Sequence, residues 1–219
     1  MNQRILVILP HPDDEAFGLS GTLAKRIAEG DQVTYACLTL GEMGRNMGVP
    51  PFANRVTLPK IRKLELEESA RAIGIQDLRM LGFHDKTIEF EDQERLDGLI
   101  RGLLEELNPS LVITFYPGYS VHPDHDATGA AVIRTIQGLP AERRPVVHCL
   151  AFSRNCQQVL GPPDVLDDVS DYLELKMKSI QAHRSQFQFE DFLGTKNPSD
   201  EEIKAHFGKE HFWTYSFED

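Results

Sequence analysis

The sequence lacks the features that mark several large classes of protein. None of its apolar runs approaches the roughly 20 residues that a membrane-spanning helix needs, and Ile5–Leu9 is too short for the core of a secretion signal. There are three cysteines and no C-x-x-C pair, an odd and sparse set that argues against a disulfide framework. We therefore expect a cytoplasmic protein with reduced thiols and no membrane partner.

Signatures of nucleotide and nucleic-acid binding are missing as well. Neither G-x-G-x-x-G nor a Walker lysine follows the first apolar run, which argues against the alternative of a nucleotide-binding α/β module. Basic residues are scarce, with 23 Lys and Arg against 34 Asp and Glu, so the formal net charge is −11. Because an acidic surface repels a phosphate backbone, nucleic acid is not an expected partner.

What the chain does have is an alternation of short apolar runs with segments of helical periodicity. Strands are expected at Ile5–Leu9, Val33–Leu38, Arg79–Leu81, Leu111–Phe115 and Val146–Phe152, and helices at Ala16–Glu29, Ile61–Ile73, Leu96–Leu107, Thr128–Ile136 and Tyr172–Arg184. This alternation predicts an α/β fold with a doubly wound, mostly parallel sheet and helices on both faces. A length of 219 residues suits a single domain, 1–219.

Three stretches carry no such periodicity: Gly41–Leu58, Gly118–His125 and the tail from Asp191 onward. We expect the first two to be loops. Long loops in compact α/β domains are usually binding elements or lids.

Two clusters of polar residues follow predicted strands. His-Pro-Asp-Asp-Glu, His11–Glu15, comes directly after the first strand, and His-Pro-Asp-His, His122–His125, follows Leu111–Phe115 after a short loop. Ligands of open α/β sheets bind beyond the C-terminal ends of the strands, and strands 1 and 4 are neighbours in the order 3-2-1-4-5. We therefore expect the two clusters to meet across one crevice.

The residue types in these clusters suit a catalytic metal. A catalytic zinc ion takes three protein ligands, mostly imidazole and carboxylate, and keeps one position open for water. His11, Asp14 and His125 meet this requirement. The side chain of Asp13 diverges from that of its neighbour and is then free to act as the general base.

The remaining members of the two clusters have less specific roles. His122 is interpreted as a proton donor or as a cation that stabilises the tetrahedral intermediate, and Asp124 could fix its tautomer by a hydrogen bond. Glu15 and Asp126 are interpreted as first-turn helix charges. The structural alternative is that Asp13 and Asp14 simply cap the helix that starts near Ala16.

Together the two motifs resemble those of the LmbE-like family of N-acetylglucosaminyl deacetylases. The match spans most of residues 3–187, and two weaker stretches support it: Arg62, Glu65, Ala70 and Gly74, then Lys178, His183, Ser185 and Gln186. The resemblance implies a Rossmann-like fold and a zinc-dependent hydrolase, with iron as a possible metal. It also implies the same three metal ligands, the same base and the same acid, acting on a small amino-sugar substrate.

Within that family the chain is most similar to the bacillithiol-pathway deacetylases, because of the stretch Gly41–Gly48 and the compact length. This implies N-acetylglucosaminyl malate as substrate. An amidase that cleaves thiol–sugar S-conjugates would use the same site and stays open. We also expect a homo-oligomer.

Three further residues are candidate substrate contacts. The resemblance implies that Arg62 reaches the substrate and that Glu42 borders the sugar, and Arg45 could meet the malate carboxylates because guanidinium matches carboxylate geometry. Each of them could also be an ordinary solvated side chain. Some family members have a tyrosine near the scissile carbonyl, for which Tyr119, Tyr172 and Tyr215 are all candidates.

Overall fold

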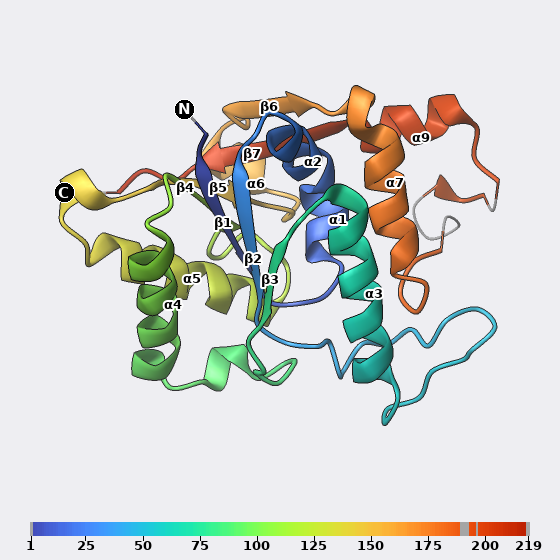
Figure 1. Ribbon diagram of the computed structural model, residues 1–219, viewed down its shortest axis with the longest axis horizontal. Coiled ribbons are helices and arrows are strands. Elements are labelled where there is room, and N and C mark those ends of the chain that lie inside the picture. The colour runs from blue at the N-terminus through green and yellow to red at the C-terminus, as the bar shows by residue number, and fades with distance from the viewer. Residues whose placement is uncertain (1, 189–192, 196, 218–219) are drawn as a thin grey trace.

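The computed structural model describes residues 2–188, 193–195 and 197–217. Its strands are β1 (Arg4–Leu9), β2 (Gln32–Cys37), β3 (Asp77–Met80), β4 (Leu111–Phe115), β5 (Val146–Leu150), β6 (Val165–Asp168) and β7 (Lys209–Thr214). They form one seven-stranded sheet in the order β3-β2-β1-β4-β5-β7-β6 (Figure 1). The first five pair in parallel, and β7 runs antiparallel to both β5 and β6. The predicted order 3-2-1-4-5 is thus confirmed.

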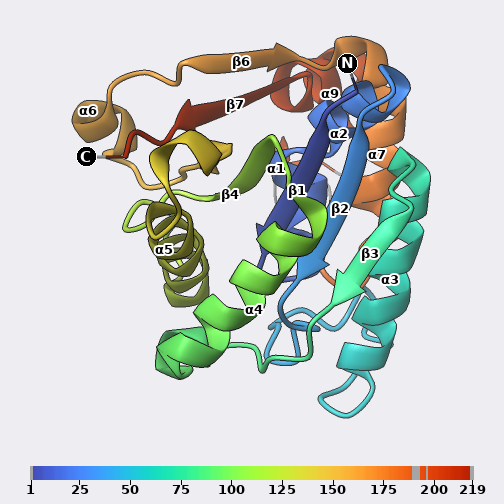
Figure 2. The same ribbon diagram turned by 60° about the vertical axis from the view of Figure 1, so that its left-hand side comes forward.

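Helices cover both faces of this sheet. They are α1 (Asp14–Gly18), α2 (Ser20–Ala28), α3 (Leu58–Ile73), α4 (Gln93–Leu107), α5 (Pro123–Gln137), α6 (Cys156–Leu160), α7 (Leu173–Ala182) and α9 (Asp200–Phe207), with 3-10 turns η1 (Ile88–Phe90), η2 (Ala141–Arg143) and η3 (Ser170–Tyr172). Figures 1 and 2 show α4 and α5 on one side of the strands and α2, α3 and α7 on the other. None of the helices in the described ranges is both long and apolar enough to cross a membrane.

The central strand β1 shows why the sequence folds in this way. Alternate side chains point to opposite faces of a strand. Ile5, Val7 and Leu9 pack into the core on the side of α2 and α3, whereas Leu6 and Ile8 pack on the side of α4 and α5. A strand buried on both faces must be apolar throughout, which is why it reads as a continuous run.

The second motif lies in a helix, whereas the sequence predicted a loop there. Helix α5 begins at Pro123 and not at Thr128, with His122 as its N-cap. Proline suits the first helical position because its missing N–H would have no partner there and its φ is already helical. Asp124 and His125 therefore sit in the first turn of a helix, after the loop that follows β4.

Two other predictions need correction. The predicted helix Ala16–Glu29 is two helices, α1 and α2, which break at Leu19. The tail after Asp191 is also more regular than expected, since α9 starts on a capping box formed by Ser199 and Glu202 and leads into β7. The part of that prediction that falls on residues 191–192, 196 and 218–219 lies outside the described residues.

Candidate active site

A cavity of about 470 Å³ lies where β1 and β4 end. Both motifs contribute to its wall, so the expected meeting of the two clusters is what the structure shows. The lining residues are His11, Asp13, Asp14, Met43, Gly44, Arg45, Arg62, Asp85, Lys86, His122, His125 and Gln186.

The three predicted metal ligands converge at one point of this wall. His11 Nδ1 lies 3.1 Å from His125 Nε2 and 3.5 Å from an oxygen of Asp14, and the other oxygen of Asp14 lies 3.2 Å from His125 Nε2. Nitrogen and oxygen ligands about 2.1 Å from a tetrahedral ion lie about 3.4 Å from one another. The distances of the two nitrogens from each other, and of each nitrogen from its nearer Asp14 oxygen, are therefore compatible with a single zinc-sized cation.

Each of the two imidazoles makes a hydrogen bond through the ring nitrogen that faces away from this point. These bonds leave the lone pairs of the other two ring nitrogens directed toward the point. His11 Nε2 lies 3.2 Å from carboxylate oxygens of both Asp124 and Asp85, so it carries a proton. His125 Nδ1 lies 3.0 Å from the carbonyl oxygen of Ser120 and donates to it. The nitrogens that face each other are then both acceptors, as in metal sites whose histidines are oriented by a second hydrogen bond.

The pKa values of His11 and Asp14 reflect the opposite charges that surround this point. Burial alone would lower the pKa of His11, but hydrogen bonds to Asp124, Asp14 and Asp85 raise it well above 6.5. Burial would likewise raise the pKa of Asp14, yet His125 and His11 hold it far below its usual range. A divalent ion would satisfy the same three donors.

His122 stands beside the ligands but is oriented differently. Its ring lies edge-on to that of His11, with centroids 4.8 Å apart. It also offers a nitrogen within 4.8 Å of those of His11 and His125. However, Nδ1 accepts a hydrogen bond from the backbone N–H of Asp124 at 3.2 Å. The proton of the neutral ring is therefore on Nε2, which can donate a hydrogen bond into the cavity but cannot bind a metal at the same time.

Asp124 does not play the role expected from the sequence. One carboxylate oxygen accepts from Lys86 N at 2.6 Å and contacts His11 Nε2, and the other accepts from Ile88 N at 3.2 Å. Both oxygens are thus engaged away from the ring of His122. Asp124 instead orients the ring of His11, because the first turn of α5 aims its carboxylate across the crevice toward the end of β1.

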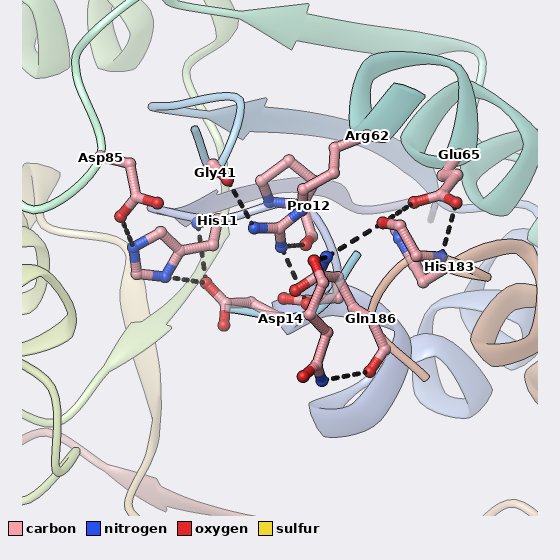
Figure 3. A network of polar contacts seen from close by, with 12 residues as sticks. His11, Pro12, Asp14, Gly41, Arg62, Glu65, Asp85, His183 and Gln186 are labelled. Atoms are coloured by element: carbon pink, nitrogen blue, oxygen red, sulfur yellow. Dashed lines mark hydrogen bonds and ion pairs between the residues drawn. The ribbon is translucent and has the colours of Figure 1, made fainter. Parts of the chain in front are cut away.

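Arg62 binds Asp13, the predicted base. Arg62 is 3% exposed, and its guanidinium donates to the carbonyl oxygens of Gly41 and Pro12 (Figure 3) and, at 2.8 Å, to the Asp13 carboxylate. The solvated-helix alternative for Arg62 is therefore wrong. Burial raises the pKa of Asp13, Arg62 opposes that rise, and the neighbouring carboxylate of Asp14 adds to it. A carboxyl with a raised pKa is a better proton acceptor.

Comparison with known proteins is consistent with this geometry. The family model described as GlcNAc-PI de-N-acetylase (PIG-L) matches residues 6–136. The chain belongs to the PIG-L family. It is 48% identical, over the full length of both chains, to a probable N-acetyl-alpha-D-glucosaminyl L-malate deacetylase 2 from Bacillus cereus, and 48% identical, again over both full lengths, to the protein of the same name from Bacillus subtilis. The resemblance identified in the sequence is thus confirmed.

A solved structure agrees with the fold. The N,N'-diacetylchitobiose deacetylase from Pyrococcus horikoshii, in complex with its inhibitor MPG, is 26% identical to this chain. The match covers 97% of this chain and 84% of that one, with a TM-score of 0.74. The α/β fold of this PIG-L family member is therefore shared with a deacetylase of known structure.

The other predicted contacts differ in their surroundings. Arg45 lines the cavity, is exposed and has no ion pair within the described part of the chain. Glu42 is absent from the cavity lining, and its carboxylate accepts a hydrogen bond from Asp85 N at 3.1 Å. Tyr119, Tyr172 and Tyr215 are all described and all absent from the lining.

Sequence reasoning missed Asp85 and Lys86. Both line the cavity from the loop after β3, and Asp85 also accepts from Met43 N at 2.8 Å. The signal was present, since Phe83-His84-Asp85-Lys86 follows a predicted strand just as the two motifs do. This signal is weak, because β3 is short and only half-buried and is therefore hard to recognise as a strand in the sequence.

Proposed function

We propose that this PIG-L family member is a zinc-dependent amide hydrolase that removes the acetyl group from N-acetylglucosaminyl malate. The observation that carries the proposal is the convergence of His11 Nδ1, His125 Nε2 and the Asp14 carboxylate at one point, with the Asp13 carboxylate on the same cavity wall. The names of the Bacillus relatives supply the substrate.

The proposed roles follow from the contacts of each residue. A divalent ion bound by His11, Asp14 and His125 would act as a Lewis acid toward the amide carbonyl. Asp13 takes the proton from the attacking water, and Arg62 fixes the direction of its carboxylate. His122 donates from Nε2 to the carbonyl oxygen as negative charge develops there. Asp13 then returns the proton to the departing amine.

Two exposed cationic side chains that line the cavity suit the binding of an anionic aglycone. We assign the malate carboxylates to Arg45, joined by Lys86, because both line the cavity, both are exposed, and neither has an ion-pair partner among the residues described. Arg62 is already committed to Asp13, so we assign it to the base and not to malate. Glu42 accepts a hydrogen bond from Asp85 N, and we assign it to shaping the cavity wall through Asp85.

Acetate release tests this proposal. N-acetylglucosaminyl malate and free N-acetylglucosamine should be compared on enzyme whose metal content is measured on the same sample. We expect about one divalent ion per chain and a higher kcat/KM for the malate glycoside. If zinc-loaded enzyme releases no acetate from either amide, the proposed function is wrong. Equal kcat/KM on both would retain the deacetylase and refute the malate assignment.

A further inference from the structure

A buried polar network lies directly behind the first motif, and the roles assigned so far make no use of it. Its centre is Glu15, which lies in the first turn of α1, as expected from the sequence, and is fully buried. One carboxylate oxygen accepts from Ser69 Oγ at 2.6 Å and from His183 Nε2 at 2.8 Å. The other accepts from the backbone N–H of Asp13 at 3.1 Å and faces the hydroxyl of Tyr35 at 3.2 Å.

The backbone of Asp13 needs such support. Its φ of 113° lies in a region that residues other than glycine rarely adopt. A conformation of this kind persists only where the surroundings hold it. Two residues do so here: the Glu15 carboxylate accepts from the N–H of Asp13, and Arg62 donates to both the Asp13 carboxylate and the preceding carbonyl of Pro12.

His183 is the partner that fixes Glu15 from the opposite side. It ends α7, is fully buried and comes from one of the two weaker sequence matches. Because a carboxylate only accepts hydrogen bonds, the Nε2 of His183 must donate. The neighbouring Ser185 is itself tied to α3, since its N–H and Oγ donate to Glu65 at 2.8 and 2.6 Å. Figure 3 shows Glu65 and His183 beside each other at this junction.

We propose that His183 and Glu15 are positioning residues that hold the general base Asp13 in its working orientation. The chain of contacts runs from His183 Nε2 through the two oxygens of Glu15 to the N–H of Asp13. It connects α7 to the catalytic loop without touching the three metal-facing atoms. This inference rests on the proposed function, because it takes Asp13 as the base.

Three variants test the inference on metal-loaded enzyme. His183→Leu removes the donor, and His183→Gln keeps an N–H near the position of Nε2. Ser179→Ala is the matched control, because Ser179 lies on α7, is equally buried and bonds Ser69 at 2.7 Å, one step further from Asp13. Misplacing a reacting group by about 1 Å costs on the order of 100-fold. We therefore expect His183→Leu to lower kcat by about 10- to 100-fold, with KM and metal content unchanged.

The expected pattern separates positioning from general stability. His183→Gln should recover most of the lost kcat, and Ser179→Ala should keep the kcat of the unmodified enzyme even where its melting temperature falls. A crystal structure of His183→Leu should show the distance between Asp13 Oδ2 and Arg62 Nη2 lengthened from 2.8 Å. If His183→Leu does not fold, Glu15→Gln tests the same step, since its NH2 group must face either the Asp13 N–H or His183 Nε2–H.

Other results would overturn the inference. It is wrong if His183→Leu and Glu15→Gln both turn over like the unmodified enzyme, or if Ser179→Ala loses as much kcat as His183→Leu. It is also wrong if His183→Leu loses its metal, since the network would then serve the ligands. Failure of the proposed function looks different, because the unmodified enzyme would itself release no acetate.

Discussion

Asp13 and Asp14 are neighbours in the chain, yet their carboxylates have different surroundings. Asp14 contacts two imidazoles, and these hold its pKa far below the usual value although burial opposes them. Asp13 has one cationic partner, Arg62, and burial keeps its pKa raised. An acid that stays ionised suits a metal ligand, and one that accepts protons suits a base. The geometry thus favours the two roles over simple helix capping, and Asp13, although it is the N-cap of α1, makes no side-chain capping bond.

The first prediction separates these two carboxylates. Asp13→Asn keeps the shape of the side chain but cannot take a proton, so kcat should fall by about 10²- to 10⁴-fold while metal content stays at the unmodified level. Asp14→Asn should lose metal, because three protein ligands are near the minimum for such a site. Metal analysis and acetate release on both purified variants check this. Loss of metal from Asp13→Asn alone would mean that the roles are reversed.

The second prediction concerns the two arginines. A hydrogen bond to a charged group contributes about 1.5–3 kcal/mol, so Arg45→Gln should raise KM for N-acetylglucosaminyl malate by about 10-fold or more. The same substitution should leave the KM for N-acetylglucosamine unchanged. Arg62→Gln should lower kcat on both substrates, because its partner is Asp13. Kinetics on the two substrates distinguish these cases, and a malate-specific KM effect from Arg62→Gln would restore Arg62 as the aglycone contact.

At this scale the sequence predicted the residues whose chemistry is local. His11, Asp14 and His125 stand out because their spacing after two strands is unusual. Glu15 is the first-turn acid that the sequence predicted, but its burial could not be predicted, because it depends on contacts with Ser69 of α3 and His183 at the end of α7. Asp85 and Lys86 reach the cavity through the path of a loop, which periodicity cannot predict.

At the level of elements, the break between α1 and α2 depends on a distant residue. Glu210, on β7, accepts from Gly21 N at 3.0 Å and Thr22 N at 2.7 Å, and so caps α2. Lys176 of α7 pairs with the same carboxylate at 2.5 Å and donates to Phe17 O at 3.1 Å, near the end of α1. The helical periodicity from Ala16 to Glu29 could not reveal this break, because the capping residue lies almost at the other end of the chain.

The third prediction tests this buried pair. Glu210→Gln leaves the charge of Lys176 buried and unpaired, which should lower the free energy of unfolding by about 3–5 kcal/mol. Adding Lys176→Met should recover much of that loss, because an apolar replacement removes the unpaired charge. Glu174→Gln is the control on the same helix, since its pair with Lys178 is exposed and should hardly change the melting temperature. Urea unfolding of the unmodified protein and the three variants measures these free energies. Equal stability of Glu210→Gln and of the double variant with Lys176→Met would refute the prediction.

For the whole molecule, the predictable part of the sheet is its parallel centre. Strands β1, β2 and β4 are almost entirely buried, so their sequences read as apolar runs with helices between them. The strands β6 and β7 were missed because each alternates buried and exposed positions over a few residues, and they meet only through antiparallel pairing across a long separation. The candidate site was predictable because it lies where two central strands end.

The last prediction concerns the pH dependence of stability. The Glu15–His183 pair contributes to it at both ends of the pH range. Burial alone would lower the pKa of His183, but Glu15 raises it above 6.5. Stabilisation from His183 is therefore fully present below about pH 6.5 and is lost as the pH rises through the folded value. Burial would raise the pKa of Glu15, but His183 and Ser69 lower it below 4.5, so its stabilisation is lost as the pH falls through that lowered value.

Comparison with His183→Gln isolates this contribution, because groups shared by the two proteins cancel in the difference of their unfolding free energies. On metal-free protein that difference should be largest between about pH 4.5 and 6.5 and should shrink by about pH 9. Urea titrations at these values measure it directly. A difference that stays constant from about pH 6 to about pH 9 would show that His183 is neutral throughout this range. In that case Glu15 would be held by a neutral donor, and the pair would stabilise the loop that carries Asp13 equally at every pH in the range.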